Sequence, residues 1–130
     1  MIAETGYNGA LGYRSSKSQY GDTKKTHREA KKATKVANAM KKEGWQFASH
    51  SWGHINMTTA SVDDIKKDTA LWQKEVQPIV GKTPVLIFPF GADIGSFTNY
   101  TNDNAKYTYL KSSGFSISIM LMRHRHHGVN

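Results

Sequence analysis

The chain has 130 residues, which is enough for one compact domain and too few for two independent hydrophobic cores. Hydrophobic residues make up 38% and charged residues 22% of the sequence, a composition that indicates a globular protein and excludes a low-complexity chain. The formal net charge of +8 favours polyanionic partners, and by itself it does not distinguish nucleic acid from anionic lipid or an anionic cell-wall polymer.

The N-terminal part of the sequence predicts a short strand, a long loop and a helix. Residues 2–4 are expected to form the strand, and residues 5–18 supply glycine, asparagine and serine for the loop. From about residue 22 to residue 42, apolar residues recur at steps of three and four, which predicts an amphipathic helix. Its many lysines are expected to form the solvated face, and Gly44 stands where the residue after a helix belongs.

The middle of the sequence predicts two strands around a second helix. Residues 45–49 are expected to form a short strand that leads directly into His50-Ser-Trp-Gly-His54. Ser61 begins a capping-box pattern for a helix that Gly81 ends. The expected buried stripe of that helix is Ile65, Ala70, Leu71, Trp72 and Val76. The apolar run 85–88 then predicts an interior strand, which Pro89 stops.

The C-terminal part predicts a third helix over residues 105–112 and a fourth strand over residues 115–120. Strands and helices that alternate in this way indicate an α/β domain, in which helical crossovers join the strands of a parallel sheet or of a barrel segment. In both architectures the ligand site lies at the C-terminal ends of the strands. His50, His54, Phe90 and Gly91 are expected to meet there.

Two histidines four residues apart, His50 and His54, form the first candidate site. Neutral imidazoles at this spacing can bind one divalent ion, and the chain has no cysteine to serve as an alternative metal ligand. The pattern alone leaves two interpretations open, because His-x-x-x-His also occurs by chance in polar loops. Gly53 disfavours a regular helix between the two histidines.

The sequence around both predicted strand ends resembles the NodB-like polysaccharide deacetylases of carbohydrate esterase family four. Residues 44–56, with His50-Ser-Trp-Gly-His54, are similar to the family's second motif, His-Ser/Thr-x-x-His. Residues 86–91, Leu-Ile-Phe-Pro-Phe-Gly, are similar to its third motif, Arg-x-Pro-Tyr-Gly or Phe-x-Tyr-Pro-Tyr-Gly. The resemblance covers roughly residues 5–115. It implies that residues 1–130 form a single, partial deacetylase domain, part of a distorted (β/α) barrel.

This resemblance implies a metal-dependent hydrolase that removes N-acetyl groups from chitin, peptidoglycan or a similar N-acetylated glycan. His50 and His54 would bind a divalent metal ion, with zinc as the first candidate. The ion would acidify a water molecule and polarise the acetyl carbonyl. The backbone N–H of Phe90 would stabilise the oxyanion, which makes Phe90 the expected catalytic residue.

The resemblance also implies a substrate-binding groove that includes Trp52, Pro89 and Gly91. For Trp52, a place in the hydrophobic core is the alternative interpretation. Trp45 and Trp72 are expected more clearly in the core.

The family's first motif, an Asp pair that supplies the third metal ligand and the catalytic base, is absent from this sequence. Asp63 and Asp64 follow the His motif at a helix start, where capping accounts for them. The late motifs are also not recognisable, and the tail histidines do not match them. We therefore expect a fragment of a longer deacetylase, inactive or weakly active by itself. The alternative is a non-catalytic carbohydrate-binding module derived from the same fold.

The expected partner is an N-acetylated polysaccharide. Nucleic acid is not expected, because the net charge is unaccompanied by zinc-finger spacing or an RNA-recognition signature. The sequence shows no secretory signal and no apolar run that could span a membrane. The parent protein is expected to be extracellular or associated with the cell wall, and a homo-oligomer or a missing N-terminal segment is expected to cover the open sheet edges.

Overall fold

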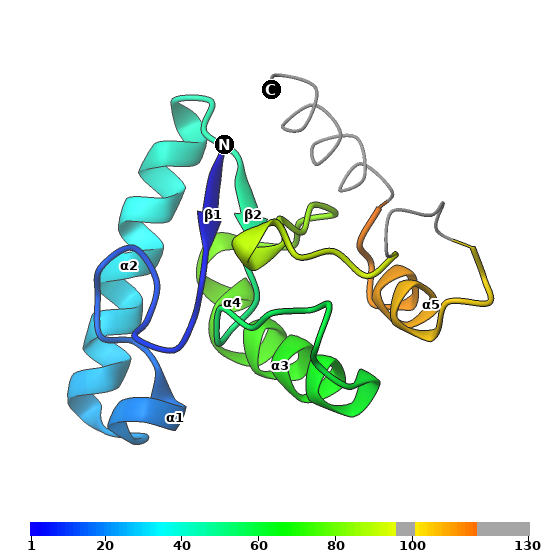
Figure 1. Cartoon of the computed structure of the whole chain (residues 1–130). Coiled ribbons are helices and arrows are strands. Elements are labelled where there is room, and N and C mark those ends of the chain that lie inside the picture. The colour runs from blue at the N-terminus through cyan, green and yellow to red at the C-terminus, as the bar shows by residue number, and fades with distance from the viewer. Residues whose placement is uncertain (96–100, 117–130) are drawn as a thin grey trace.

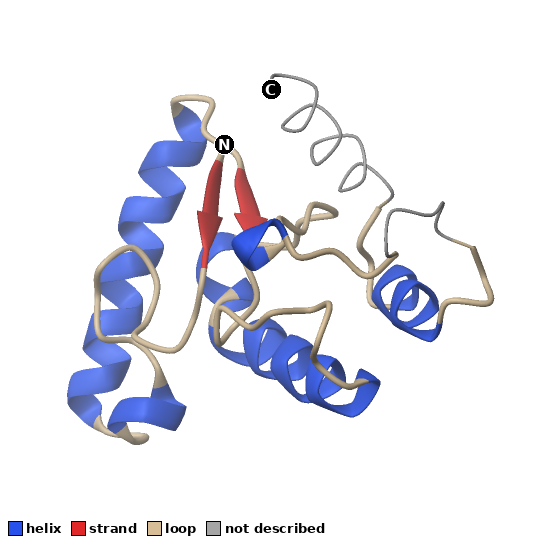
Figure 2. Ribbon diagram, viewed as in Figure 1, coloured by secondary structure: helices blue, strands red, loops and turns tan. Residues whose placement is uncertain are grey.

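The computed structural model describes residues 1–95 and 101–116, which form a mixed helix and strand fold with a small parallel sheet. Figure 1 shows the longest helix running alongside the two strands, and Figure 2 shows how much of the remainder is helix and loop. In chain order the elements are β1 (Ile2–Glu4), α1 (Lys17–Tyr20), α2 (Lys24–Lys42), β2 (Phe47–Ser49), α3 (Val62–Glu75), α4 (Gln77–Val80), the 3₁₀ turn η1 (Pro89–Gly91) and α5 (Ala105–Ser112).

The two strands predicted for the first half of the chain are confirmed. β1 and β2 pair in parallel, with Ile2 opposite Phe47 and Glu4 opposite Ser49. Parallel pairing requires a crossover between the strands, and α2 provides it. The α/β class expected from the sequence is therefore correct for the described residues.

The strand predicted over residues 85–88 is wrong in its extent. This segment forms a single parallel bridge, Leu86 with Ser49. Two hydrogen bonds make the bridge: Ser49 N–H donates to the Val85 carbonyl (2.9 Å), and Ile87 N–H donates to the Ser49 carbonyl (2.8 Å). Prolines lie at both ends of the run, and a proline has no N–H to extend a ladder. The apolar segment therefore lies beside β2 and pairs with it at one residue only, which is too little for a strand.

Helix α2 forms as predicted. The hydroxyl of Thr23 caps it by accepting from Thr26 N–H (3.1 Å), and Gly44 follows its end at φ 94°. Ala33 and Ala37 face inward and are fully buried. The predicted solvated face is confirmed, because the basic residues of this helix are exposed.

The second predicted helix is divided into α3 and α4. Ser61 caps α3 as expected, accepting from Asp64 N–H (3.1 Å). Pro78 cannot donate a backbone hydrogen bond, so the helical ladder breaks after Glu75, and Gly81 ends α4 instead. Ala70 was expected in the buried stripe and is exposed, because a step of five residues from Ile65 leads to another face of the helix.

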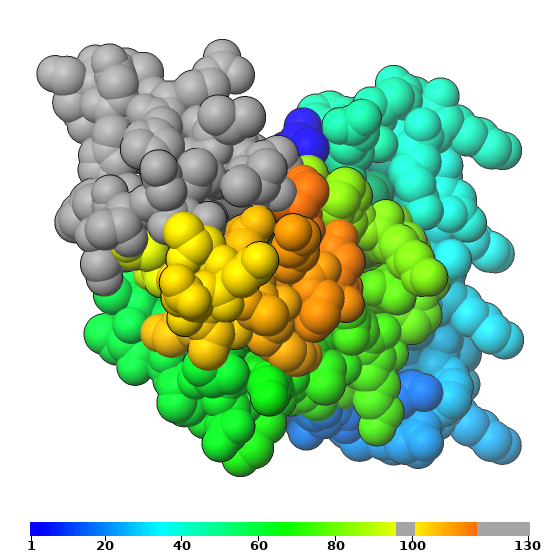
Figure 3. Space-filling model, turned by 90° about the vertical axis from the view of Figure 1, so that its right-hand side faces the viewer, coloured from blue at the N-terminus to red at the C-terminus, as the bar shows by residue number. Residues whose placement is uncertain are grey.

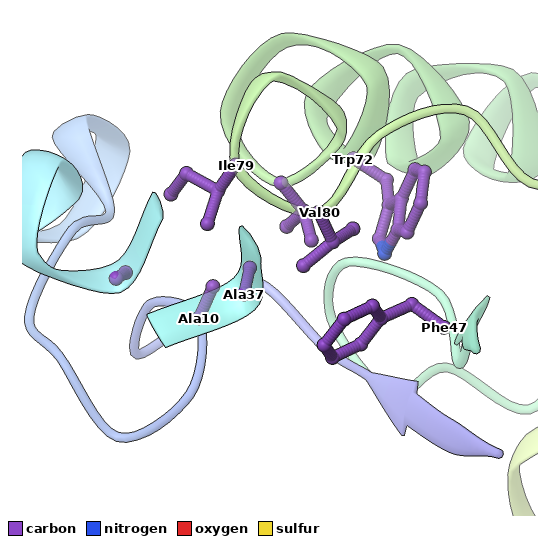
Figure 4. Close-up of a cluster of buried hydrophobic side chains, with 8 residues drawn as sticks. Ala10, Ala37, Phe47, Trp72, Ile79 and Val80 are labelled. Atoms are coloured by element: carbon purple, nitrogen blue, oxygen red, sulfur yellow. The ribbon is translucent and has the colours of Figure 1, made fainter. Parts of the chain in front are cut away.

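The core consists of two clusters of buried side chains. One joins α2, β2, α3 and α4, and Figure 4 shows Phe47 and Trp72 converging with Ile79 and Val80. The second lies under α5, which packs against α3 (Figure 3). Trp72 is 1% exposed, which confirms its place in the core. Trp45 is 45% exposed, so its expected core position is wrong; it precedes β2 immediately after the turn at Gly44.

The third predicted helix is confirmed as α5, with Asn104 as its cap. Of the predicted strand 115–120, residues 117–120 lie outside the described residues. Ser116 N–H donates to the Pro84 carbonyl (2.7 Å), which brings this end of the described chain beside the segment that pairs with β2. Within residues 1–95 and 101–116, no helix has the length and apolar character needed to cross a membrane.

Candidate functional site

The loop that follows β2 carries both histidines, and the strand ladder fixes the first of them. His50 N–H donates to the Glu4 carbonyl at the end of β1 (3.0 Å). Its ring Nδ1 lies 2.7 Å from the Ile87 carbonyl oxygen. A carbonyl only accepts hydrogen bonds, so Nδ1 carries the ring proton and Nε2 of the neutral ring has a free lone pair. His50 is thus held in the tautomer that can bind a metal ion through Nε2.

The rings of His50, His54 and Phe90 lie in contact. The centroids of the two imidazoles are 4.7 Å apart, with an angle of 65° between the ring planes. The Phe90 ring lies 4.6 Å from the His54 ring, at 69°. Two imidazoles that share one zinc ion at ~2.0 to 2.1 Å have centroids roughly 5 Å apart, so the observed separation is compatible with a common ion. Of the four residues expected to meet, His50, His54 and Phe90 do so through their rings, and Gly91 follows Phe90 in the chain.

The backbone between the histidines turns sharply. Ser51 has a φ of 60° and His54 a φ of 53°, both in the left-handed region that residues with side chains rarely adopt. The buried Ser51 hydroxyl accepts from Ile55 N–H (3.0 Å), and Ser51 N–H donates to the Ser49 hydroxyl (3.2 Å). Ser51 therefore orders the loop through its own hydrogen bonds.

A buried carboxylate on α3, Asp68, holds the same loop. It accepts from Trp52 N–H and from Gly53 N–H, each at 2.8 Å, and it is 6% exposed. Burial raises the pKa of Asp68 above its ordinary value, and these two hydrogen bonds offset only part of the effect. Sequence analysis did not identify this residue. The available signal was its place three residues after Ile65 and four before Trp72, a polar residue on an apolar stripe.

A second carboxylate of α3, Glu75, joins this loop to the long loop after β1. It accepts from the Ser16 hydroxyl (2.8 Å), from the backbone N–H and hydroxyl of Ser18, and from Trp52 Nε1–H (3.1 Å). Burial alone would raise the pKa of Glu75, but the hydrogen bonds from Ser18, Ser16 and Trp52 outweigh it and lower the pKa. Glu75 lies on the same helical face as Asp68, two turns later.

Trp52 is partly buried, and further contacts hold it in place. Its carbonyl accepts from Gly6 N–H (2.9 Å) and Tyr7 N–H (3.0 Å), and its ring packs against the core cluster that contains Val76. Gly6 is required there, since a Cβ atom at this position would lie 2.3 Å from Trp52 Cδ1. These contacts favour the interpretation that Trp52 belongs to the hydrophobic core over the interpretation that its ring forms an exposed wall of a substrate groove.

The turn that corresponds to the third motif presents its residues differently. Pro89 is fully buried, whereas Phe90 is 72% exposed and Gly91 is exposed. Phe90 has a φ of 61°, and the left-handed backbone places its ring over His54. Of the three residues, Phe90 and Gly91 are the ones accessible to a ligand.

No third ligand joins the two imidazoles within the described residues, where no group of three or more His, Asp or Glu side chains could hold a metal ion. Glu4 ends β1, but its carboxylate accepts from Leu11 N–H (3.2 Å) in the neighbouring loop, and burial raises its pKa. Asp63 and Asp64 lie in the first turn of α3, as expected for a helix start. Asp93 is buried, and its carbonyl accepts from the Thr58 hydroxyl (2.5 Å). Within the described residues, the two imidazoles therefore have no carboxylate or third histidine placed to complete a set of metal ligands.

Comparison with known families gives one match. The family model of polysaccharide deacetylases matches residues 21–112, which is more than half of the chain. This chain belongs to the polysaccharide deacetylase family. The matched residues of this chain extend from α2 to α5 and include His50, His54 and the Pro89–Gly91 turn. No curated protein and no solved structure matches the chain.

Proposed function

We propose that this chain is part of a metal-dependent hydrolase that removes N-acetyl groups from a polysaccharide such as chitin or peptidoglycan. Family membership supports the deacetylase class. The observation that carries the metal dependence is the hydrogen bond from His50 Nδ1 to the Ile87 carbonyl (2.7 Å). Histidines that bind metals ordinarily donate their second ring N–H to a carbonyl or carboxylate in this way.

His50 and His54 would hold the divalent ion, and zinc is the first candidate because neutral imidazoles suit it. When bound, the ion would acidify a water molecule and polarise the acetyl carbonyl. Zinc sites ordinarily take at least three protein ligands, and the described residues contribute two. We therefore propose that the chain is inactive or weakly active alone, and that another segment or chain provides the remaining ligand and the base.

The turn from Pro89 to Gly91 would face the acetyl group. Its contact with His54 supports this placement, because the Phe90 ring lies 4.6 Å from that imidazole. The Phe90 N–H would donate to the oxyanion that forms when the carbonyl is attacked. Among the described residues, no atom other than those of its chain neighbours lies within 4 Å of where a Cβ on Gly91 would stand, which supports a place for a sugar beside Phe90. Trp52 and the buried Pro89 would shape this groove from behind.

The parallel arrangement of β1, β2 and the bridge at Leu86 supports a larger architecture. In our proposal these are consecutive strands of a distorted (β/α) barrel, and residues 1–130 are one partial domain of it. β1 lies at one end of the strand order, so its outer edge would be covered by a further segment or by a second copy of the chain. A polymeric N-acetylated substrate would place the parent protein outside the cell or at the cell wall.

Zinc titration tests the metal half of the proposal. The histidines of the C-terminal tail would compete for zinc, so the measurements use a chain in which His124, His126 and His127 are changed to alanine. We expect isothermal titration calorimetry to detect one zinc site in this background. His54→Ala should abolish it, whereas His27→Ala, an exposed histidine paired with Asp22, should leave it intact. Equal zinc binding in all of these variants would refute metal binding by the imidazole pair.

Acetate release from an N-acetylglucosamine oligomer, with and without added zinc, tests the hydrolase half. Zinc-dependent release that disappears in His54→Ala supports the deacetylase, and release that survives in that variant contradicts it. The second candidate function is a non-catalytic carbohydrate-binding module, favoured by the absence of a third metal ligand among the described residues. Oligomer binding that needs no zinc and yields no acetate supports this module.

A further inference from the structure

We infer that Asp68 is a positioning residue for the imidazole pair. Its two hydrogen bonds to the loop between the histidines would raise the metal affinity of the site by holding that loop in place. Asp68 lies on α3, outside both motifs that carry the family resemblance. The inference rests on the proposed metal-binding function and adds to it a residue that would not touch the ion. Three features of the structure support it.

The first feature is the geometry of the two hydrogen bonds. Asp68 Oδ2 accepts from Trp52 N–H and Oδ1 from Gly53 N–H, both at 2.8 Å, so each oxygen holds one amide. Hydrogen bonds to an ionised carboxylate are short and roughly twice as strong as neutral ones. Because Asp68 is buried among its partners and belongs to a regular helix, it fixes the two amides against a rigid element.

The second feature is the strain in the segment that these bonds hold. Trp52 and Gly53 lie between the left-handed residues Ser51 and His54. Such backbone conformations are unfavourable for residues with side chains and persist only where the surroundings enforce them. Without Asp68, the segment is free to relax toward ordinary φ values. That relaxation would rotate His54 and change the 4.7 Å separation of the ring centroids.

The third feature is the unequal anchoring of the two rings. His50 has anchors that do not depend on Asp68: its N–H donates to Glu4 and its Nδ1 to Ile87. For His54, the structure shows ring contacts with His50 and Phe90. Loss of the Asp68 carboxylate should therefore displace His54 and leave His50 in place.

The test compares Asp68→Asn with Asp63→Asn, both in the chain that lacks the tail histidines. The two substitutions make the same chemical change on the same helix, but Asp63 is exposed in the first turn. An asparagine at position 68 can accept a hydrogen bond from only one of the Trp52 and Gly53 N–H groups. Its NH₂ group would face the other N–H, and two donors cannot form a hydrogen bond. We expect zinc affinity by calorimetry to fall about 10- to 100-fold in Asp68→Asn and to stay unchanged in Asp63→Asn, as for the loss of other residues that orient metal ligands.

Nuclear magnetic resonance of the histidine rings provides a readout that a general loss of stability would not produce. In Asp68→Asn without zinc, the His54 ring signals should shift while His50 keeps its Nδ1-protonated tautomer. A second measurement uses the chain with Asp68 intact: zinc should slow hydrogen exchange at the Trp52 and Gly53 amides, because coupling between the two interactions is reciprocal. This measurement still tests the inference if the Asp68→Asn variant does not fold, because it uses the chain with Asp68 intact.

The outcomes separate this inference from the function on which it rests. If zinc does not bind through His50 and His54 at all, the proposed metal site fails. If zinc binds there with equal affinity in Asp68→Asn and Asp63→Asn, the positioning role of Asp68 is overturned and the metal site stands. Unchanged exchange at Trp52 and Gly53 on zinc binding overturns the positioning role in the same way.

Discussion

Replacing Glu75 with glutamine should destabilise the fold by a predictable amount. Glu75 Oε1 accepts from Ser16 and Trp52, and Oε2 accepts from the N–H and hydroxyl of Ser18. A glutamine has one accepting oxygen, and either hydroxyl can reverse its hydrogen bond toward an NH₂ group. The Trp52 and Ser18 N–H groups cannot reverse, so one of them loses its partner in either amide orientation. A fully buried donor without a partner costs about 1 to 3 kcal/mol; these two hydrogen bonds are part-buried, so the loss should lie at the lower end, about 1 kcal/mol.

The pH dependence of this difference has a definite sign. The pKa of Glu75 is lowered in the folded chain from its ordinary value of 4.5, so the ionised carboxylate stabilises the fold. That contribution is fully present above pH 4.5 and is lost as the pH falls through the lower, folded-state pKa. Glutamine does not titrate. The stability difference between the two proteins should be largest at neutral pH and should shrink below pH 4.5.

Urea denaturation followed by far-ultraviolet circular dichroism measures this difference without relying on tryptophan fluorescence, which the variant itself would alter near Trp52. Glu43→Gln is the matched control, because the same change at an exposed glutamate after α2 removes the same charge. The control should unfold at the midpoint of the unmodified chain. The reasoning is refuted if Glu75→Gln also unfolds at that midpoint at pH 7, or if its deficit stays constant from pH 7 to pH 3.

Two further predictions concern packing, and both are checked by the same urea denaturation. Gly6→Ala should cost about 1 to 3 kcal/mol, because the added Cβ would lie 2.3 Å from Trp52 Cδ1 and 2.8 Å from Val76 Cγ2; an unchanged midpoint would contradict this packing. Trp72→Ala should cost about 3 to 5 kcal/mol as a 1% exposed core residue, whereas Trp45→Ala, at a 45% exposed position, should cost no more than about 0.5 kcal/mol. Equal losses in the two tryptophan variants would contradict this assignment of core and surface.

Helices α2, α3 and α5 could be predicted from the sequence because their signals are local, whereas the short helix α1 was not predicted and begins within the loop expected over residues 5–18. The spacing of Ala33 and Ala37, the cap at Ser61 and the glycine after α2 all act within a few residues of the elements that they define. The strand predicted over residues 85–88 was wrong because strand length depends on partners far away in the sequence. An apolar run between two prolines gives no indication of how many neighbours will pair with it.

The candidate site could be predicted only in part. The convergence of His50, His54 and Phe90 follows from parallel strands that end at one edge, and the structure brings the three rings into contact. Asp68 and Glu75 were missed because carboxylates on a helix are ordinarily solvated. Their spacing placed them on the buried stripe of α3, but their bonding partners lie in loops whose paths the sequence does not reveal.

The imidazole pair is built from contacts that require no metal. The Ile87 carbonyl fixes the tautomer of His50, β1 fixes its backbone, and two carboxylates of α3 fix the loop that leads to His54. In a site preformed in this way, binding loses little free energy to the ordering of the ligand side chains. In the proposed site, the number of ligands should then limit the affinity for zinc as long as Asp68 holds the loop between the histidines. Providing a third ligand should strengthen binding without moving either ring, whereas loosening α3 should weaken binding even with both histidines present.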